Sequence, residues 1–527
     1  MEQLIESDRQ SSPVARARQM LARAEWASLA YRSYDLATVR RIARAAAQAA
    51  GAAAAELAQA AVAETGYGVV AHKSMKNEAC STGLVEHYRD GDWVSTQWDA
   101  ERAIARIPRP AGIIVALTPS TNPVATVYFK TLLALLTRNA VVISPHPAAR
   151  ESSARAAHIL AEAAVAAGAP DGVVQVVEKP SIPVIDALMT DPRTSLIVAT
   201  GGSAVVRAAY SSGNPAYGVG PGNVPVMVDR TADVTRAAKS IVASKAFDNS
   251  VLCTNESVLI VDEQVRAQLL RAMRSAGAVL LDDDQTQRLR SYLFPNGSLN
   301  TAAIGKSASH IAQEVGIRSP RDASCLLAPF GLAVPEEPLT HEKLCPVLGV
   351  TSAHDPARGI AIARAVLRIA GAGHSAAIHS SDPRTITDFA ASVPVLRVSV
   401  NVGNSTGSSG LDTNLAPTMT IGTGFVGRSS LGANLAPHHL VNYTEAAFGT
   451  APGTPVVDLG GLELTHAPQG PVPPYPAPSN ADSTTDLGRA LERPGSGEQA
   501  PTSPASEEMR EAIRRMVIEE LTEFINR

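Results

Sequence analysis

Cysteine and aromatic residues are scarce in this chain of 527 residues, which holds four cysteines and 4% Phe, Trp and Tyr. The cysteines have no C-x-x-C spacing, so we expect neither a disulfide framework nor a zinc site. They are Cys80, Cys253, Cys325 and Cys345. Any cysteine with a chemical role would therefore act as a lone thiol.

An excess of one charge and long apolar runs are also missing. The formal net charge of -4 leaves no broad basic surface of the kind that binds nucleic acid. No run of about 18 apolar residues could cross a bilayer, and the polar segment Met1–Ser12 lacks the apolar core of a secretion signal. We expect a cytoplasmic protein that has neither nucleic acid nor a membrane as a partner.

What the chain does have is 45% hydrophobic residues, enough for two or three cores. Leu36, Val39 and Ile42 recur at helical spacing and predict helices in the first hundred residues. Short β-branched runs then alternate with helical stretches, of which Arg150 to Ala167 is the clearest. The runs cover 112–117, 140–144, 173–177 and 196–199. This order predicts an α/β fold with a doubly wound parallel sheet, whose ligands bind at the carboxyl ends of the strands.

Three further regions follow. A second set of α/β elements between about 225 and 402 predicts a second domain. The Pro-, Gly-, Ser- and Thr-rich stretch from about 450 to 506 predicts a disordered, flexible linker. Beyond it, apolar residues recur mostly at i+3 or i+4 and predict a C-terminal amphipathic helix. These residues are Met509, Ile513, Met516, Leu521 and Phe524.

Cys253 stands in the segment KAFDNSVLCTNESVLIV. By composition alone a buried, inert cysteine is the better interpretation. The surrounding motifs reverse it: PSTNPVATVYFKTLLALLTRNAVVISPHPAA, LIVATGGSAVVRAAYSSG, AYGVGPGNVPVMVD, the cysteine segment, HEKLCPVLGV and GAGHSAAIHS occur in this order. Over about residues 15 to 450 the chain resembles the coenzyme A-acylating aldehyde dehydrogenases. The resemblance is greatest to the aldehyde half of bifunctional aldehyde-alcohol dehydrogenases and to the propionaldehyde dehydrogenases of bacterial microcompartments.

The resemblance implies an aldehyde dehydrogenase-like fold with a doubly wound cofactor-binding domain, an α/β catalytic domain and an oligomerisation hairpin. It also implies a homodimer or homotetramer, paired through a hairpin near 102–109 and a late strand near 420–445. The expected divisions are N-terminal helices at 1–98, an oligomerisation segment at 99–111, a dinucleotide-binding domain at 112–224, a catalytic domain at 225–408, an oligomerisation and closing segment at 409–450, a linker at 451–504 and an amphipathic targeting helix at 505–527.

By the same resemblance, Cys253 is the nucleophile that adds to an aldehyde, and NAD takes the hydride. The side-chain amide of Asn122 and the backbone N–H of Cys253 would hold the developing oxyanion. His374 would assist the thiol, because a neutral imidazole can accept its proton. Two alternatives remain: Asn122 as a turn residue before Pro123, and His374 as a loop histidine satisfied by backbone groups.

Hydrolytic relatives activate water with a glutamate, and the matching position here is Val219. An apolar side chain cannot act as a base, so the acyl group is expected to pass to the thiol of coenzyme A. The rival interpretations are a hydrolytic aldehyde dehydrogenase that releases a free acid, and a non-catalytic assembly scaffold. The aldehyde is expected to be short, of the acetaldehyde or propionaldehyde class.

The cofactor-binding residues expected from the resemblance follow predicted strands. Backbone N–H groups at the start of a helix could face a pyrophosphate there. Glu342 would bind the nicotinamide ribose, and its alternative is a solvated surface carboxylate. The other expected residues are Thr200, Gly201, Gly202 and Ser203 at the helix start, and Thr118, Ser144, Pro145 and His146 on neighbouring strands. Of these, Ser144, Pro145 and His146 would line an adenosine pocket that NAD and coenzyme A occupy in turn.

NAD is preferred over NADP in this interpretation, because no arginine cluster stands beside Ser144 to His146, although Arg150 is close. Two other motifs are rejected. Gly422 to Gly427 satisfies G-x-G-x-x-G but does not open a helix, and the His341–Glu342 pair lacks a second histidine at the zinc-binding spacing. No metal is expected.

The C-terminal segment resembles the encapsulation peptides of bacterial microcompartments. Residues 505–527 would then bind shell proteins or co-encapsulated enzymes, and the protein would reside in the microcompartment lumen. The alternatives are a helix that folds back on its own oligomer, and a coiled-coil assembly device.

Overall fold

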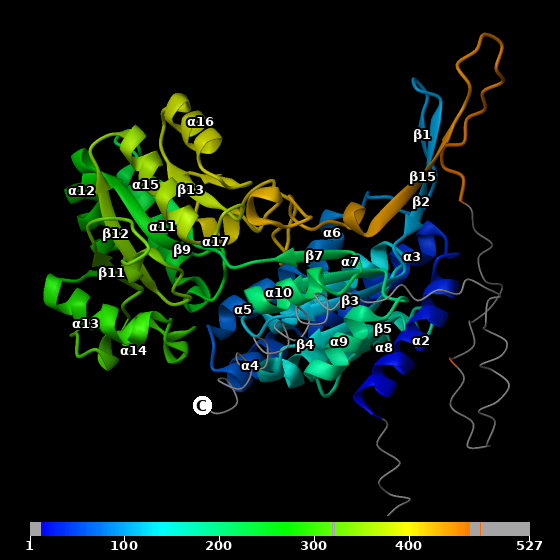
Figure 1. The fold of residues 1–527 in the computed structure, drawn as a ribbon, viewed down its shortest axis with the longest axis horizontal. Helices are drawn as coiled ribbons and strands as arrows, with labels where there is room; N and C mark the ends of the chain where they lie inside the picture. Colours follow the sequence, from blue (N-terminus) through cyan, green and yellow to red (C-terminus); the bar gives the residue numbers. More distant parts are fainter. Residues whose placement is uncertain (1–11, 319, 321, 464–474, 476–527) are drawn as a thin grey trace, which may run out of the picture.

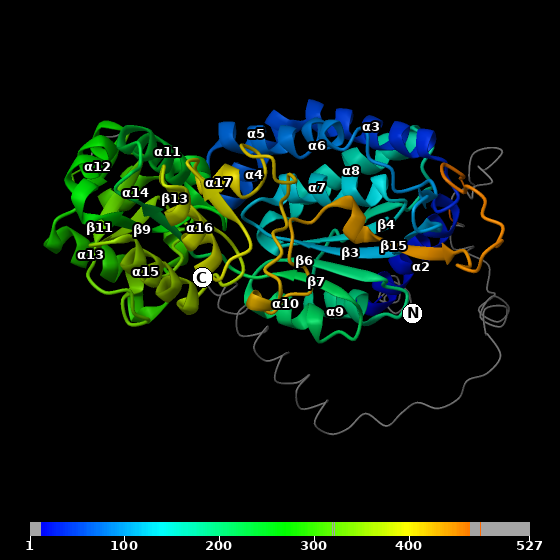
Figure 2. The ribbon, with the colours of Figure 1, turned by 90° about the horizontal axis from the view of Figure 1, so that it is seen from above.

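The computed structural model describes residues 12–318, 320, 322–463 and 475. Two α/β lobes lie side by side, and a small antiparallel sheet projects from one of them (Figure 1). The helices of the first lobe cover both faces of its sheet, which Figure 2 shows from above. No helix in the described part of the chain is long and apolar enough to cross a membrane.

The first lobe is built on a five-stranded parallel sheet with the order β5-β4-β3-β6-β7. The two central strands β3 and β4 are buried along their whole length, as their β-branched composition predicts. The strands are β3 (Ile113–Thr118), β4 (Ala140–Pro145), β5 (Val174–Val176), β6 (Leu196–Thr200) and β7 (Ala216–Val219). The doubly wound sheet expected from the sequence is confirmed.

Helices of the first lobe come from both sides of this strand series in the chain. The predicted helices of the first hundred residues include two between Leu36 and Thr65, because the chain turns at Ala53. The second of them ends at Gly66, whose φ of +69° suits glycine. The helices are α2 (Pro13–Tyr31), α3 (Leu36–Ala52), α4 (Ala54–Thr65), α5 (Val70–Ala79), α6 (Thr82–His87), α7 (Pro123–Leu136), α8 (Arg150–Ala166), α9 (Ile182–Thr190) and α10 (Ser203–Tyr210).

The second lobe holds a seven-stranded parallel sheet with the order β10-β11-β12-β9-β8-β13-β14, and it confirms the second α/β set. Its strands are β8 (Val224–Val228), β9 (Glu256–Asp262), β10 (Ala278–Leu280), β11 (Cys325–Pro329), β12 (Val347–Ala353), β13 (Ala376–His379) and β14 (Val398–Val400). Its helices are α11 (Val234–Ala246), α12 (Glu263–Ser275), α13 (Asp283–Leu293), α14 (Ala308–Glu314), α15 (Pro356–Ile369), α16 (Pro383–Ser392) and α17 (Asn404–Gly407). Residues 220–223 connect the two lobes, since β7 ends one sheet and β8 belongs to the other.

The projecting sheet consists of β1 (Gln97–Asp99), β2 (Ile104–Pro110) and β15 (Val441–Ala447). β15 pairs with β2 antiparallel along its whole length. The expected hairpin is therefore present, but the late strand lies at 441–447 rather than throughout 420–445. Residues before it form an isolated bridge and short 3-10 turns, where glycine and proline interrupt any strand.

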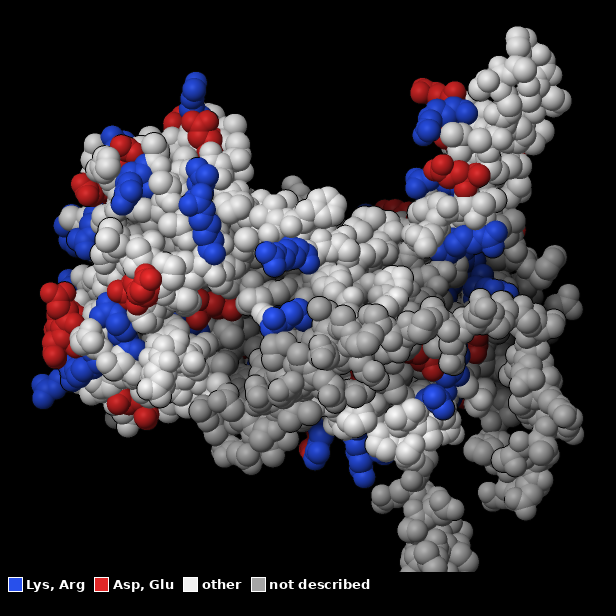
Figure 3. All heavy atoms as spheres, viewed as in Figure 1, with Lys and Arg blue, Asp and Glu red and all other residues white. Residues whose placement is uncertain are grey.

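Charged residues of both signs are intermixed on the face drawn in Figure 3, including on the projecting sheet. There, Arg106 Nε lies 3.6 Å from Glu445 Oε1 across the β2–β15 pair. This face has no large area of a single charge.

The first part of the expected linker is attached to the first lobe. The N–H of Thr96 donates to the carbonyl of Leu462 at 3.0 Å, and the N–H of Gly461 donates to the carbonyl of Thr96 at 2.9 Å. The expectation of a flexible linker from residue 451 is therefore wrong at 461–462, which backbone pairing holds against Thr96. Apart from Tyr475, the rest of the linker and the predicted helix at 505–527 lie outside the described residues.

Candidate active site

Cys253 lies in the loop between the 3-10 turn η2 (Phe247–Ser250) and β9, and it is partly exposed. The connection between the lobes packs directly against it. A Cβ atom on Gly222 would lie 2.0 Å from the carbonyl oxygen of Cys253, so only glycine allows this approach. Val219, at the end of β7, is buried and 3% exposed. The nucleophile expected from the sequence therefore lies at the boundary of the two lobes.

His374 is in hydrogen-bond contact with this thiol. Its Nε2 lies 3.1 Å from Cys253 Sγ, and its Nδ1 lies 2.9 Å from Ser375 Oγ. Asn404 Nδ2 donates to that Ser375 oxygen at 2.9 Å. Both ring nitrogens thus contact side chains, so the alternative of a loop histidine satisfied by backbone groups is wrong.

The surroundings favour the neutral form of both partners. Exclusion of water raises the pKa of Cys253 to about 12, and Glu342 adds to this rise, while Arg397 opposes it. Burial also lowers the pKa of His374 to about 3, with a further contribution from Arg397. A neutral thiol therefore faces a neutral imidazole, and the proton has to move as the sulfur attacks.

Arg397 holds the histidine segment in place. Its guanidinium donates to the carbonyl of His374 at 2.9 Å and to the carbonyl of Gly422 at 2.6 Å, and its Nε donates to Asn434 Oδ1 at 2.6 Å. Gly422 belongs to the rejected glycine motif. That motif ends in a 3-10 turn, Phe425–Gly427, and no helix opens after it, so the reason for rejecting it is confirmed.

Glu342 is only partly exposed and lies near the Cys253 thiol. Its carboxylate accepts from the N–H of Gly222, and its charge raises the pKa of Cys253. Burial raises the pKa of Glu342 itself to about 8, partly offset by Lys245. The alternative of a freely solvated carboxylate does not fit this position.

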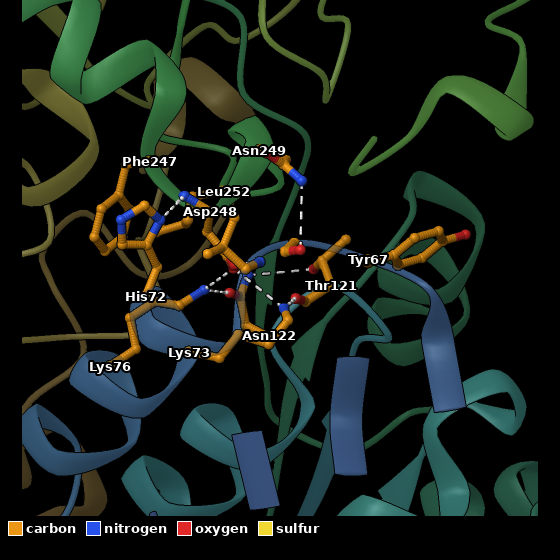
Figure 4. A network of polar contacts seen from close by, with 12 residues as sticks. Tyr67, His72, Lys73, Lys76, Thr121, Asn122, Phe247, Asp248, Asn249 and Leu252 are labelled. Carbon is orange, nitrogen blue, oxygen red and sulfur yellow. Dashed lines mark hydrogen bonds and ion pairs between the residues drawn. The ribbon is translucent and has the colours of Figure 1, made fainter. Parts of the chain in front are cut away.

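Asn122 precedes α7 as its N-cap, but its side chain makes no cap hydrogen bond. Instead, Oδ1 accepts from Lys76 Nζ, and Nδ2 donates to Thr121 Oγ1 at 3.4 Å (Figure 4). The same lysine forms an ion pair with Asp248, five residues before Cys253. The amide is thereby linked to the nucleophile loop through Lys76 and Asp248, and a purely turn-forming role does not account for it.

The expected cofactor residues gather at the carboxyl ends of neighbouring strands. Thr118 pairs with Pro145 at the ends of β3 and β4, and Thr200 ends the adjacent β6. The buried hydroxyl groups of Thr118 and Ser144 have no hydrogen-bond partner among the described residues. Such an edge suits a nucleotide, because strand ends and helix starts present polar groups to it. Gly201, the N-cap Gly202 and Ser203 at the start of α10 complete this edge, and His146 caps the following 3-10 turn through its Nδ1.

Several site residues were missed by sequence reasoning. Lys73, Lys76, Asp248, Ser375 and Arg397 all contact segments that carry an expected catalytic residue. Only the lysines left a signal: they stand three residues apart in KSMKN, on one face of a short helix. Among the described residues, no group of three or more His, Cys, Asp or Glu could hold a metal ion.

A doubly wound sheet with polar strand ends is joined here to a second α/β lobe, and a thiol–imidazole pair lies at the boundary. This arrangement suits an enzyme that binds a nucleotide and uses a cysteine as nucleophile. Residues 7–290, more than half of the chain, match the aldehyde dehydrogenase family. The protein belongs to that family.

Its relatives are acylating oxidoreductases. The chain is 37% identical over 436 residues to the bifunctional aldehyde-alcohol dehydrogenase of Escherichia coli, a match that covers 81% of this chain and 49% of that protein. It thus spans about half the length of the bifunctional relatives. It is 34% identical to the succinate-semialdehyde dehydrogenase (acetylating) of Clostridium kluyveri, over 73% of this chain and 85% of that one. An acetylating aldehyde dehydrogenase from Geobacillus thermoglucosidasius has a similar structure, with a TM-score of 0.82, 36% identity and coverage of 83% of this chain and 97% of that one.

Proposed function

We propose that the protein catalyses the NAD-dependent, coenzyme A-acylating oxidation of a short-chain aldehyde of the acetaldehyde or propionaldehyde class. The observation that carries this proposal is the 3.1 Å contact between Cys253 Sγ and His374 Nε2, in a site where Val219 replaces the water-activating glutamate. A similar structure supports it: propionaldehyde dehydrogenase of Rhodopseudomonas palustris, solved with bound CoA and an acylated cysteine, has a TM-score of 0.74 and 27% identity, over 82% of this chain and 96% of that one.

The residues divide the work as follows. His374 Nε2 takes the thiol proton while Cys253 Sγ adds to the aldehyde carbon. The carbonyl oxygen becomes negative, and the N–H of Cys253 and the Nδ2 of Asn122 donate to it. The cofactor at the strand ends supplies the acceptor for the hydride that leaves this carbon. The thiol of coenzyme A then attacks the resulting thioester, which frees Cys253 and yields the acyl-coenzyme A.

Whether water or coenzyme A accepts the acyl group depends on whether a base near the thiol can activate water. Val219 is apolar and cannot accept a proton from water, and the carboxylate of Glu342 accepts from the N–H of Gly222. A thioester in this site therefore persists until a better nucleophile arrives.

Single-turnover kinetics with and without coenzyme A test this function. Without coenzyme A, we expect a burst of about one NADH per site followed by very slow turnover, because the thioester accumulates. Adding coenzyme A should restore steady turnover and yield the acyl thioester. Steady release of free acid without coenzyme A would show a hydrolytic enzyme instead. No burst with any of a panel of short aldehydes would favour the scaffold.

The preference for NAD rests on the charges near the adenosine pocket. The nearest arginine after His146 is Arg150, whose exposed guanidinium lies 3.5 Å from Glu151. A neighbouring carboxylate would weaken its hold on a 2′-phosphate. An engineered glycolyl-CoA reductase of similar fold was solved with NADP+, so the specificity constants for NAD and NADP have to be compared directly. A higher constant for NADP would contradict the proposal.

Assembly and targeting are further parts of the proposal. β15 has one outer edge left free of described partners, since the sheet order is β1-β2-β15, and we propose that a second copy of the chain pairs there in a homodimer or homotetramer. A monomer in sedimentation at micromolar concentration would contradict this.

We also propose that residues 505–527 address the enzyme to a microcompartment, through shell proteins or co-encapsulated enzymes. A similar structure is a propionaldehyde dehydrogenase from the fucose utilisation microcompartment of Clostridium phytofermentans, with a TM-score of 0.75 and 28% identity, over 82% of this chain and 97% of that one. Deleting 505–527 should leave turnover nearly unchanged and abolish co-purification with shell proteins. Entry of the truncated enzyme into shells would contradict the targeting role.

A further inference from the structure

Three buried charged residues connect the Asn122 turn to the Cys253 loop (Figure 4). Lys73 and Lys76 project from α5, and Asp248 belongs to η2. The side chains of these residues are 4%, 1% and 0% exposed, in that order. Ions so completely removed from water are costly to bury, so their contacts require an explanation.

The two lysines share one partner and differ in another. Both form an ion pair with Asp248 Oδ2. Lys73 Nζ also donates to the backbone carbonyl of Thr121 at 2.9 Å, whereas Lys76 Nζ donates to the side-chain Oδ1 of Asn122. Only Lys76 therefore acts on the amide itself.

This contact determines how the amide is used. With Oδ1 bound to an ammonium group, the amide nitrogen has to face the other way, and it donates one hydrogen to Thr121 Oγ1 at 3.4 Å. Within the described part of the chain, that hydroxyl is its one acceptor, which leaves the second hydrogen for a ligand. A cation on Oδ1 also polarises the amide and makes its N–H a stronger donor.

The cluster carries an excess of positive charge, because two ammonium groups face one carboxylate. Burial, and then the neighbouring Lys76, lower the pKa of Lys73 to about 8, while Asp248 acts in the opposite direction. His72, the other titratable group facing Asp248, has a pKa lowered by burial, and its Nδ1 accepts from the N–H of Asp248. Such an excess is favourable where negative charge develops during a reaction.

The anionic end of the cluster holds a strained segment. Asp248, Asn249 and Ser250 have φ values of 51°, 50° and 63°, in the left-handed region that non-glycine residues rarely adopt. Asp248 is fixed from both sides, since Val69 N–H donates to its Oδ1 at 2.7 Å and its own N–H donates to His72 Nδ1 at 2.9 Å. The chain reaches Cys253 three residues after Ser250.

We propose that Lys76 is a positioning residue of the oxyanion site, which orients and polarises the Asn122 amide while Asp248 ties it to the nucleophile loop. This proposal rests on the proposed function. Its mechanism is electrostatic and acts through Asn122, so it predicts a loss in the chemical step rather than in aldehyde binding.

The test compares Lys76→Met with the matched control Lys73→Met, since each removes one ammonium and one ion pair to Asp248. We expect Lys76→Met to lower kcat by about 10- to 100-fold, with little change in the KM for aldehyde. This decrease is smaller than the one expected when an oxyanion donor is removed altogether. Lys73→Met should lower kcat much less. The rate of Cys253 alkylation by iodoacetamide should be similar in both variants, because Lys76 does not act on the thiol. Lys76→Gln serves as a second neutral variant if the thermal melt of Lys76→Met shows a loss of fold.

A double-mutant cycle with Asn122→Ala decides the mechanism. In the Asn122→Ala background, Lys76→Met should cost little further activity, because the group through which it acts is gone. Equal losses for the two lysine variants, or an undiminished effect of Lys76→Met in that background, would overturn the proposal. Full activity of Asn122→Ala would also overturn the role proposed for Lys76. The coenzyme A-dependent burst would then still be observed, so the proposed function would stand.

Discussion

Replacing His374 by glutamine removes the side chain that contacts the nucleophile and can accept its proton. The change keeps a polar group of similar reach but no base. In the native site, Nε2 lies 3.1 Å from Cys253 Sγ, and the pKa of this histidine is lowered to about 3. The imidazole is therefore unprotonated near neutral pH and can accept the thiol proton as the sulfur attacks.

The size of the effect follows from the thiol. Burial raises the pKa of Cys253 to about 12, so only a small fraction of this thiol is ionised near neutral pH. Without a base, attack depends on that small fraction, which grows about tenfold with each pH unit. We expect His374→Gln to lower kcat/KM by about 10²- to 10⁴-fold near neutrality, and the loss to shrink as the pH rises.

The assay is the dependence of kcat/KM on pH between about 5.5 and 9.5, at saturating NAD and coenzyme A. The native enzyme should show no inflection near 6.5 from His374. His379→Gln is the control, because His379 is also buried, with a pKa lowered to about 4, and ends β13 outside the site. A native inflection near 6.5 that His374→Gln abolishes would refute the argument, and so would undiminished activity of His374→Gln.

Three further results are expected. Cys253→Ala should abolish turnover and leave the thermal melt nearly unchanged; residual steady turnover would remove Cys253 as nucleophile. Gly222→Ala should lower both melting temperature and activity, because the new Cβ would lie 2.0 Å from the Cys253 carbonyl oxygen, and a native-like variant would show that the connection moves aside easily. His374 binds its proton more weakly when folded than at the usual unfolded value of about 6.5, so its contribution to stability is complete above that pH and is lost as the pH falls. At pH 5 this loss is about 2 kcal/mol, and urea unfolding of His374→Gln should lack it.

Much of the fold could be predicted because its signals are local. The β-branched runs at 112–117 and 140–144 are buried on both faces, and this burial requires uninterrupted apolar sequence. The helix expected from Arg150 to Ala167 ends within a residue of its predicted end, since Gly168 has a φ of +100° there. The predicted limits of the late strand and of the linker were wrong because they depend on pairing between distant segments. These pairs are β15 with β2 and residues 461–462 with Thr96.

The sequence by itself determined which chemistry is available: a lone thiol in Cys253, a histidine in GAGHSAA, and an apolar residue at Val219 where a base would activate water. Only the tertiary structure decided that His374 contacts Cys253, since 121 residues separate them in the chain. The same is true of Lys76 and Asp248, which are 172 residues apart. Lysine and aspartate occur at many positions in a folded chain. These two form an ion pair beside the active site because they are buried against each other. That burial comes from the packing of two lobes, which no local pattern of residues encodes.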